Sequence, residues 1–108
     1  MTVKDLLGCE SFSPITLPDP ERTVDGIYIG DLLSWVMGRA SADNAWITIM
    51  SNVNVIAVAT LTDVSCVILA EGVTLSDDII STAEAKGVNV LSTALPAYEA
   101  SVALGKLL

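Results

Sequence analysis

The sequence predicts a three-layer α/β/α domain, in which helices cover both faces of a mainly parallel sheet of about four to five strands. Short β-branched or aromatic runs alternate with helix-like segments from residue 26 to the end of the chain. The connections between them are short, which is typical of right-handed βαβ units. Residues 65–70 form an uninterrupted apolar run, as expected of a parallel strand that is covered on both faces.

The segment before residue 26 is expected to add a short helix and an edge strand. Thr2 can cap a helix over residues 2–7, Asp5 stands where a capping box places an acid, and Gly8 can end the helix. Residues 11–20 hold three prolines. Because proline lacks a backbone N–H, this stretch predicts an edge segment followed by a loop.

Turn residues and helix caps divide the rest of the chain. Asp31 is predicted to be the N-cap of a helix, Gly87 to follow the end of another, and Pro96 to stand in the first turn of the last one. Ser51 and Asn52 are predicted to precede a further helix, over residues 53–61. The expected strands cover residues 26–30, 46–50, 65–70 and 88–91, and the expected helices cover residues 32–40, 53–61, 76–86 and 96–107.

The composition narrows the classes of partner. The chain has 108 residues, a net charge of −8 and 52% apolar residues. We expect residues 1–108 to form a single domain in the cytoplasm, because no signal peptide or membrane-spanning segment is recognisable and the two cysteines are far apart. A domain this small cannot bury so large an apolar fraction, so we expect a partner, most simply a second copy in a homodimer, to cover part of its surface. The five cationic residues are scattered, which argues against nucleic acid and membrane surfaces as partners.

The sequence lacks the residues on which most self-sufficient catalysis depends. It has no histidine, which excludes Ser-His-Asp and Cys-His catalysis within the chain. It also lacks a C-x-x-C pair, a G-x-G-x-x-G fingerprint and a G-x-x-x-x-G-K-[ST] phosphate loop. Asp77 and Asp78 are interpreted as partners of a helix N-terminus rather than as a catalytic pair. We therefore expect no enzymatic activity, no bound cofactor and no metal site.

Candidate ligand-binding residues follow the predicted strands. Open parallel sheets bind small molecules at the carboxyl ends of their strands, beside helix N-termini. Free backbone N–H groups there favour an anion, although the carboxylates of Asp31 and Glu71 oppose one. Each candidate also has an ordinary structural role as a cap or turn residue. The predicted contacts are Gly30, Asp31, Ser51, Asn52, Asn54, Glu71, Gly72, Ser92, Thr93 and Tyr98.

The aromatic and sulfur-bearing side chains allow more than one interpretation. Trp35 and Trp46 could form a stacking platform, but we expect Trp46 in the core and Trp35 at a helix or subunit interface. Tyr98 could reach over the strand ends, whereas a core tyrosine with a hydrogen-bonded hydroxyl is the favoured interpretation. Cys66 is expected to be an inert core residue.

The chain resembles the DRTGG domain family over most of its length. The segment GIYIGDLLSWVMGRA at residues 26–40 carries the most specific likeness. Weaker blocks follow as AWITI at residues 45–49, CVILAEG at residues 66–72 and AYEAS at residues 97–101. The resemblance implies an α/β domain that serves as a regulatory or assembly module. Such domains are joined to CBS pairs in regulatory pyrophosphatases or to the amino-terminal part of some phosphotransacetylases, and the layout is similar to the amino-terminal domain of HPr kinase.

The sequence departs from the motif that gives the family its name. Where longer relatives have an Asp-Arg turn after the second strand, this chain has SNVN at residues 51–54. Where they have Thr-Gly-Gly, it has AEG at residues 70–72. A cation and a flexible backbone cradle are both missing, which weakens any phosphate or nucleotide site.

The sequence therefore favours a non-catalytic regulatory or interaction domain that binds another protein or a small ligand. The alternative is a sensor for an adenine nucleotide or another small ligand, suggested by the proteins in which the family occurs. The third hypothesis is an enzyme subunit or cryptic enzyme, whose activity would depend on a metal ion or a partner protein that the chain itself does not supply.

Overall fold

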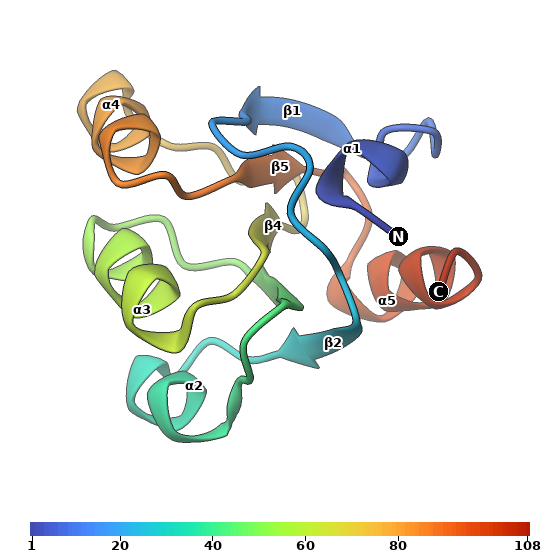
Figure 1. Cartoon of the computed structure of the whole chain (residues 1–108), viewed down its shortest axis with the longest axis horizontal. Helices are drawn as coiled ribbons and strands as arrows, with labels where there is room; N and C mark the ends of the chain where they lie inside the picture. Colours follow the sequence, from blue (N-terminus) through green and yellow to red (C-terminus); the bar gives the residue numbers. More distant parts are fainter.

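The computed structural model describes residues 1–108 as a five-stranded sheet between two layers of helices (Figure 1). Across the sheet the strand order is β1-β5-β4-β3-β2. The predicted α/β class is confirmed. In chain order the elements are α1 (Val3–Leu6), β1 (Ser13–Thr16), β2 (Gly26–Ile29), α2 (Leu33–Arg39), β3 (Asn44–Thr48), α3 (Asn54–Thr62), β4 (Cys66–Leu69), α4 (Asp77–Ala85), β5 (Val90–Ser92) and α5 (Ala97–Gly105).

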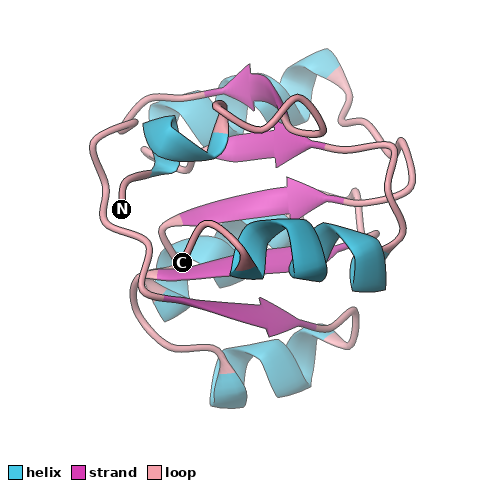
Figure 2. Cartoon of the chain, turned by 90° about the vertical axis from the view of Figure 1, so that its right-hand side faces the viewer, coloured by secondary structure: helices cyan, strands magenta, loops and turns pink.

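The sheet is parallel except at one edge. β2, β3, β4 and β5 run parallel to one another, and Figure 2 shows them directed toward the same side of the molecule. β1 pairs antiparallel with β5, and its register shifts between Pro14 and Thr16. The predicted edge segment in the proline-rich stretch is confirmed, because proline and an irregular register are tolerated where one side of a strand has no partner.

Alternating side chains of the central strands divide the core in two. Trp46 belongs to the cluster under α2, α3 and α4, whereas the neighbouring Ile47 belongs to the cluster that holds α1 and α5. Figure 1 shows these two helical layers on opposite faces of the sheet. Val3 and Leu6 of α1 are fully buried in the same cluster as Leu104 of α5, so the chain ends share one core. No helix has the length and apolarity needed to cross a membrane.

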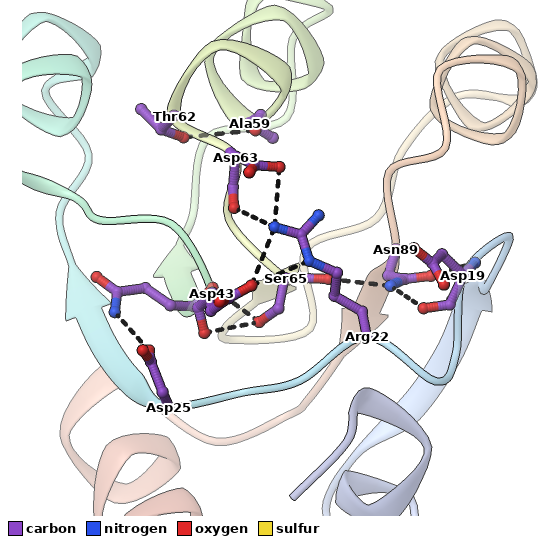
Figure 3. A network of polar contacts seen from close by, with 10 residues as sticks. Asp19, Arg22, Asp25, Asp43, Ala59, Thr62, Asp63, Ser65 and Asn89 are labelled. Atoms are coloured by element: carbon purple, nitrogen blue, oxygen red, sulfur yellow. Dashed lines mark hydrogen bonds and ion pairs between the residues drawn. The ribbon is translucent and has the colours of Figure 1, made fainter.

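A polar network at the amino ends of the strands fastens the connection between β1 and β2 to the sheet (Figure 3). Arg22 donates from Nε to Asp43 Oδ1 at 3.1 Å and from Nη2 to the main-chain oxygen of Asp63 at 2.6 Å. Its Nη2 also pairs with the carboxylates of Asp43 at 3.1 Å and Asp63 at 2.8 Å. Burial acts to lower the pKa of Arg22, but its bonds to Asp63 and Asp43 outweigh burial and raise that pKa.

Asn89 makes the second fastening in this network. Its side-chain amide donates to the main-chain oxygens of Asp19 at 2.7 Å and Ser65 at 2.9 Å, and its oxygen accepts from the N–H of Asp19 at 2.9 Å. Because Asn89 is 2% exposed, these bonds satisfy a buried amide completely. The long connection therefore crosses the amino end of the sheet and leaves the carboxyl end uncovered.

The helices begin and end within one or two residues of the bounds predicted from the sequence. The capping box of α1 is confirmed, since the Thr2 N–H donates to Asp5 Oδ2 at 2.9 Å. This hydrogen bond lowers the pKa of Asp5. Gly87 follows α4 with a φ of +73°, as predicted. Pro96 is the N-cap of α5 rather than a residue of its first turn.

Two predictions about β3 and α2 are wrong. β3 ends at Thr48, although the apolar run continues through Ile49 and Met50. Asp31 is not the N-cap of α2, because Leu32 holds that position and no side chain caps the helix. Both errors have one cause, which is a bond between the carboxylate of Asp31 and the end of β3.

Candidate functional site

The loops that follow the four parallel strands all lie at one edge of the sheet. We call this the carboxyl edge and define it as residues 30–32, 49–54, 70–73 and 93–98. Each of three loops is bonded to the end of a neighbouring strand, because the N–H groups of Gly30, Ala70 and Thr93 donate to the main-chain oxygens of Ile47, Thr48 and Leu69, at 2.9 to 3.2 Å. The sequence-predicted candidates are therefore brought to a common edge, as expected for parallel strands.

Asp31 joins the loop after β2 to the end of β3. Its Oδ1 accepts from Thr48 Oγ1 at 2.7 Å and from the N–H of Ile49 at 3.0 Å. Thr48 is 2% exposed, and its Oγ1 accepts in turn from the N–H of Met50 at 3.2 Å. Sequence reasoning missed Thr48, because nothing local connects a strand threonine with an acid 17 positions earlier.

The loops after β4 and β5 are bonded to each other in the same way. Glu71 and Gly72 both adopt left-handed backbone angles, with φ of 57° and 73°. The N–H of Glu71 donates to Leu95 and that of Gly72 to Thr93, each at 2.9 Å. Thr93 is buried, and its hydroxyl accepts from the N–H of Leu95 at 3.1 Å. This half of the edge is therefore also fixed by internal bonds.

The remaining polar candidates lie at the start of α3 and after β5. Ser51, Asn52 and Asn54 are exposed, and the Asn52 side chain accepts from the N–H of Asn54 at 2.9 Å. Ser92 ends β5 and is half-buried. Tyr98, in the first turn of α5, is 74% exposed, so the favoured prediction of a core tyrosine is wrong. The alternative that Tyr98 reaches over the strand ends stays a prediction.

A model of the DRTGG domain family matches residues 20–107. The chain belongs to the DRTGG domain family. Among curated proteins, none matches the sequence. A solved structure with the same fold contains the CBS and DRTGG domains of the regulatory region of Clostridium perfringens pyrophosphatase, complexed with the activator diadenosine tetraphosphate. It superposes with a TM-score of 0.74 at 17% identity, over 95% of this chain, and this DRTGG domain spans 45% of the length of that structure.

The carboxyl edge of this DRTGG domain offers no cationic side chain to a polyanion. The N–H groups of Gly30, Ile49, Asn54, Glu71 and Gly72 all donate within the chain. The five cationic residues lie elsewhere. Arg39 is the last residue of α2, and Lys86 and Lys106 follow the last residues of α4 and α5, at the helix ends that lie away from the carboxyl edge. Arg22 is paired with Asp43 and Asp63, and Lys4 is paired with Glu21. The five bonded N–H groups are therefore not available to an anion, whereas those of Ser51, Asn52 and Val53 at the start of α3 make no hydrogen bond within the chain.

Apolar side chains, in contrast, are abundant at this edge. Ile49 and Val53 are 43% and 51% exposed, and they flank the loop that opens α3. Leu32 is 60% exposed beside Asp31, and Ile29, at the end of β2, is 48% exposed. Exposed apolar groups that are held on a bonded framework are typical of surfaces that recognise another molecule.

Trp46 and Cys66 lie in the core, as predicted, whereas the interface predicted for Trp35 stays a prediction. Trp46 is fully buried, and its Nε1 donates to the main-chain oxygen of Gly30 at 2.8 Å, which fixes the loop after β2. Trp35 is 55% exposed on α2, with the guanidinium of Arg39 stacked 4.0 Å from its ring centroid. Cys66 is fully buried, and burial raises the pKa of its thiol to about 12. A thiol with that pKa is not a nucleophile at neutral pH.

One concavity lies outside the predicted site. A groove of about 450 Å³ runs between α3 and α4 and is lined mainly by apolar side chains, including Ile56 and Leu61, with Lys86 at its border. Val53 belongs both to this groove and to the carboxyl edge. No cluster of three histidine, cysteine, aspartate or glutamate residues is close enough to hold a metal ion.

Proposed function

We propose that this DRTGG domain is a non-catalytic regulatory module that recognises a protein partner or a small ligand at its carboxyl edge. The observation that carries the proposal is the exposure of Ile49, Val53 and Tyr98 around loops that Asp31 and Thr93 hold in place. A bonded framework loses little conformational entropy on binding, so apolar contacts made there convert efficiently into affinity. Membership of the family, and the regulatory region in which a similar structure occurs, support the regulatory role.

The module works as a homodimer in this proposal, and residues 1–108 act as one domain. Its mechanism is differential binding, in which a molecule at the carboxyl edge favours one arrangement of the two copies. Eleven large apolar residues are at least 39% exposed, which supports the presence of a further interface. Two free cysteines, Cys9 and Cys66, support a cytoplasmic location.

The proposal is tested by removing apolar side chains at the edge. The double variant Ile49→Ser/Tyr98→Ser removes two exposed side chains that make no side-chain hydrogen bond, so it is expected to fold. Leu61→Ser is the matched control, because Leu61 is 70% exposed near the other end of α3. Tagged chains are purified from the native host, and the bound proteins are compared quantitatively. We expect a protein that is retained by the wild type and by Leu61→Ser to be lost from the double variant. Equal retention by all three chains would contradict the assignment of the edge.

Adenine-nucleotide binding is the second candidate, and one observation favours it. The similar pyrophosphatase regulatory region is complexed with diadenosine tetraphosphate. In this chain the exposed ring of Tyr98 offers a stacking face for a base, whereas the edge lacks cations for phosphates. We therefore expect contacts to the adenosine part rather than to the phosphates.

A thermal-shift comparison of adenosine, AMP and diadenosine tetraphosphate separates the two candidates. A ligand at 100 times its dissociation constant adds about 2.7 kcal/mol to the free energy of unfolding. Stabilisation that Tyr98→Ala abolishes would support the nucleotide hypothesis. The absence of stabilisation by all three compounds at millimolar concentration would refute it and leave a protein partner as the occupant of the edge.

A further inference from the structure

The groove between α3 and α4 has the dimensions of a small-molecule site. Its volume is about 450 Å³, and four of the seven residues that line it are hydrophobic. Pockets that bind small molecules have volumes of roughly 300–1,000 Å³ and apolar walls with a few polar groups. A stable protein interface, in comparison, involves about 20–30 residues on each side. The groove therefore fits a small molecule better than the surface of a protein partner.

The apolar wall of the groove belongs to α3. Val53, Ile56, Ala57 and Leu61 line it, and we call these four residues the α3 stripe. They follow the helical spacing i, i+3, i+4 and i+8, so they lie along one side of the helix. Val53 and Leu61, at its two ends, are 51% and 70% exposed. The α3 stripe is about 12 Å long at the rise of an α-helix, which matches an extended chain of ten carbons.

Lys86 is the one charged residue in the lining of the groove. It follows the end of α4, is exposed and belongs to none of the ion pairs of the molecule. The lining also holds two threonines, but the hydroxyl of Thr60 donates to the main-chain oxygen of Ile56 at 2.9 Å. The hydroxyl of Thr82 likewise donates to that of Asp78 at 3.0 Å. The ammonium group of Lys86 is therefore the free side-chain donor of the groove, and it is complementary to an anion.

The two ends of the groove differ in polarity. Both helices connect neighbouring parallel strands on the same face of the sheet, so α3 and α4 run in the same direction (Figure 1). Leu61 and Lys86 therefore stand toward the amino end of the sheet, whereas Val53 stands at the carboxyl edge. An anionic group at Lys86 would leave the α3 stripe free to cover an apolar chain directed toward Val53.

We propose that the groove between α3 and α4 binds a small amphiphile with one anionic group, whose charge pairs with Lys86 while its apolar chain lies on the α3 stripe. A saturated carboxylate is the simplest molecule of this class. The inference goes beyond the proposed function, because the groove shares only Val53 with the carboxyl edge and requires neither a second copy nor a protein partner.

The overall charge of the chain makes the role of Lys86 distinguishable from nonspecific binding. The net charge is −8, so an amphiphile that merely adheres to apolar surface would bind more tightly as a cation than as an anion. Residues 44–62, which include all of α3, hold no charged side chain. A preference for the anion at this groove must therefore come from Lys86.

Titrations of the full chain with decanoate and with decyltrimethylammonium, followed by the amide signals in nuclear magnetic resonance, test the site. Salt at about 150 mM screens charges more than roughly 8 Å apart. We expect decanoate to shift the amide signals of α3 and Lys86, with a dissociation constant on the order of 1 mM or lower. Hexanoate should bind at least about tenfold more weakly, because each buried methylene raises affinity by up to about fourfold.

A charge reversal with a matched control assigns the preference to one side chain. Lys86→Glu should shift the ratio of the two dissociation constants at least about tenfold in favour of decyltrimethylammonium, because attraction and repulsion are exchanged for both ligands. Lys106→Glu is the control, since Lys106 holds the same position after α5 and its replacement changes the net charge equally. That ratio should change less than about twofold in the control, because the distant charge is screened.

A third variant tests the groove itself. Ala57→Trp fills the groove from an exposed position of α3 and should weaken decanoate binding at least about tenfold by steric exclusion. Circular dichroism melting confirms that every variant is folded.

Three results would overturn the proposal. One is the absence of decanoate binding to the wild type at about 10 mM, well above the expected dissociation constant. Another is a set of shifted amide signals that lies outside α3 and α4. The last is a ratio that Lys106→Glu changes as much as Lys86→Glu does, since overall charge would then explain the preference.

Discussion

Replacing Arg22 by alanine should destabilise the domain more than any other loss of a cation. The change removes the bonds from the guanidinium to Asp43 and to the main-chain oxygen of Asp63, together with both ion pairs. It also leaves two turns with left-handed aspartates, at φ of 68° and 60°, without the side chain that joins them. The connection between β1 and β2 would then be held by Asn89 and by backbone bonds, such as those from Asp25 N–H to Asp43 and from Val24 N–H to Met1.

The magnitude follows from the exposure of the partners. The Asp63 and Asp43 side chains are 66% and 40% exposed, so solvent limits each ion pair to about 0.5 kcal/mol. The bond to the Asp63 carbonyl, made by a charged donor that is 25% exposed, contributes about 1 kcal/mol. The sum is about 2 kcal/mol, which corresponds to a decrease in Tm of roughly 10 °C for a domain of this size. Since the pKa of Arg22 is raised above its ordinary value, its protonation, and hence this difference, should not change between pH 5 and pH 9.

Urea unfolding followed by circular dichroism measures this difference. Arg22→Lys should recover less than half of the loss, because an ammonium group cannot reach both turns with a planar fork. Lys4→Ala is the control, since Lys4 pairs with Glu21 at 3.4 Å between side chains that are 64% and 70% exposed. The reasoning is refuted if Arg22→Ala lies within 0.5 kcal/mol, roughly the size of an ordinary surface substitution, of the wild type, or if Lys4→Ala costs as much.

Three further predictions concern single side chains. Asp31→Ala should cost about 1–2 kcal/mol, with a coupling of about 1 kcal/mol to Thr48→Val in a double-mutant cycle, because the buried hydroxyl loses its acceptor; additive losses would contradict the bond. Cys66, with its pKa raised to about 12 by burial, should resist alkylation at pH 8 until the protein unfolds, whereas the half-buried Cys9 reacts first. The pKa of Asp5 is lowered by its bond to Thr2, so its contribution is complete above the ordinary value of 3.8 and is lost as the pH falls below it; Asp5→Asn should flatten this acid limb of the stability profile.

The sequence was sufficient where one local signal determined the structure. The capping box at Asp5 and the glycine after α4 act within a few residues, and both were predicted correctly. The prolines similarly revealed that β1 is an edge strand, since a missing N–H has the same consequence in any fold.

Prediction failed where a distant partner decided the outcome. Asp31 has the local character of an N-cap, yet its carboxylate binds Thr48 and Ile49, which only the pairing of β2 with β3 brings within reach. For Tyr98, a position in the first turn of a helix does not reveal which side of that helix the fold buries, and the ring is exposed. The candidate edge was therefore predicted in outline, whereas the bonds that organise it depend on tertiary contacts.

Site-specific photo-crosslinking tests most directly the claim that the carboxyl edge is the recognition surface. A photoreactive phenylalanine derivative replaces Tyr98 in one chain and Ser81, an exposed residue of α4, in another. The chains are expressed and irradiated in the native host. We expect a discrete covalent adduct from position 98 and none from position 81. Adducts from position 81 alone, or an absence of any adduct from position 98 in a folded chain, would contradict it.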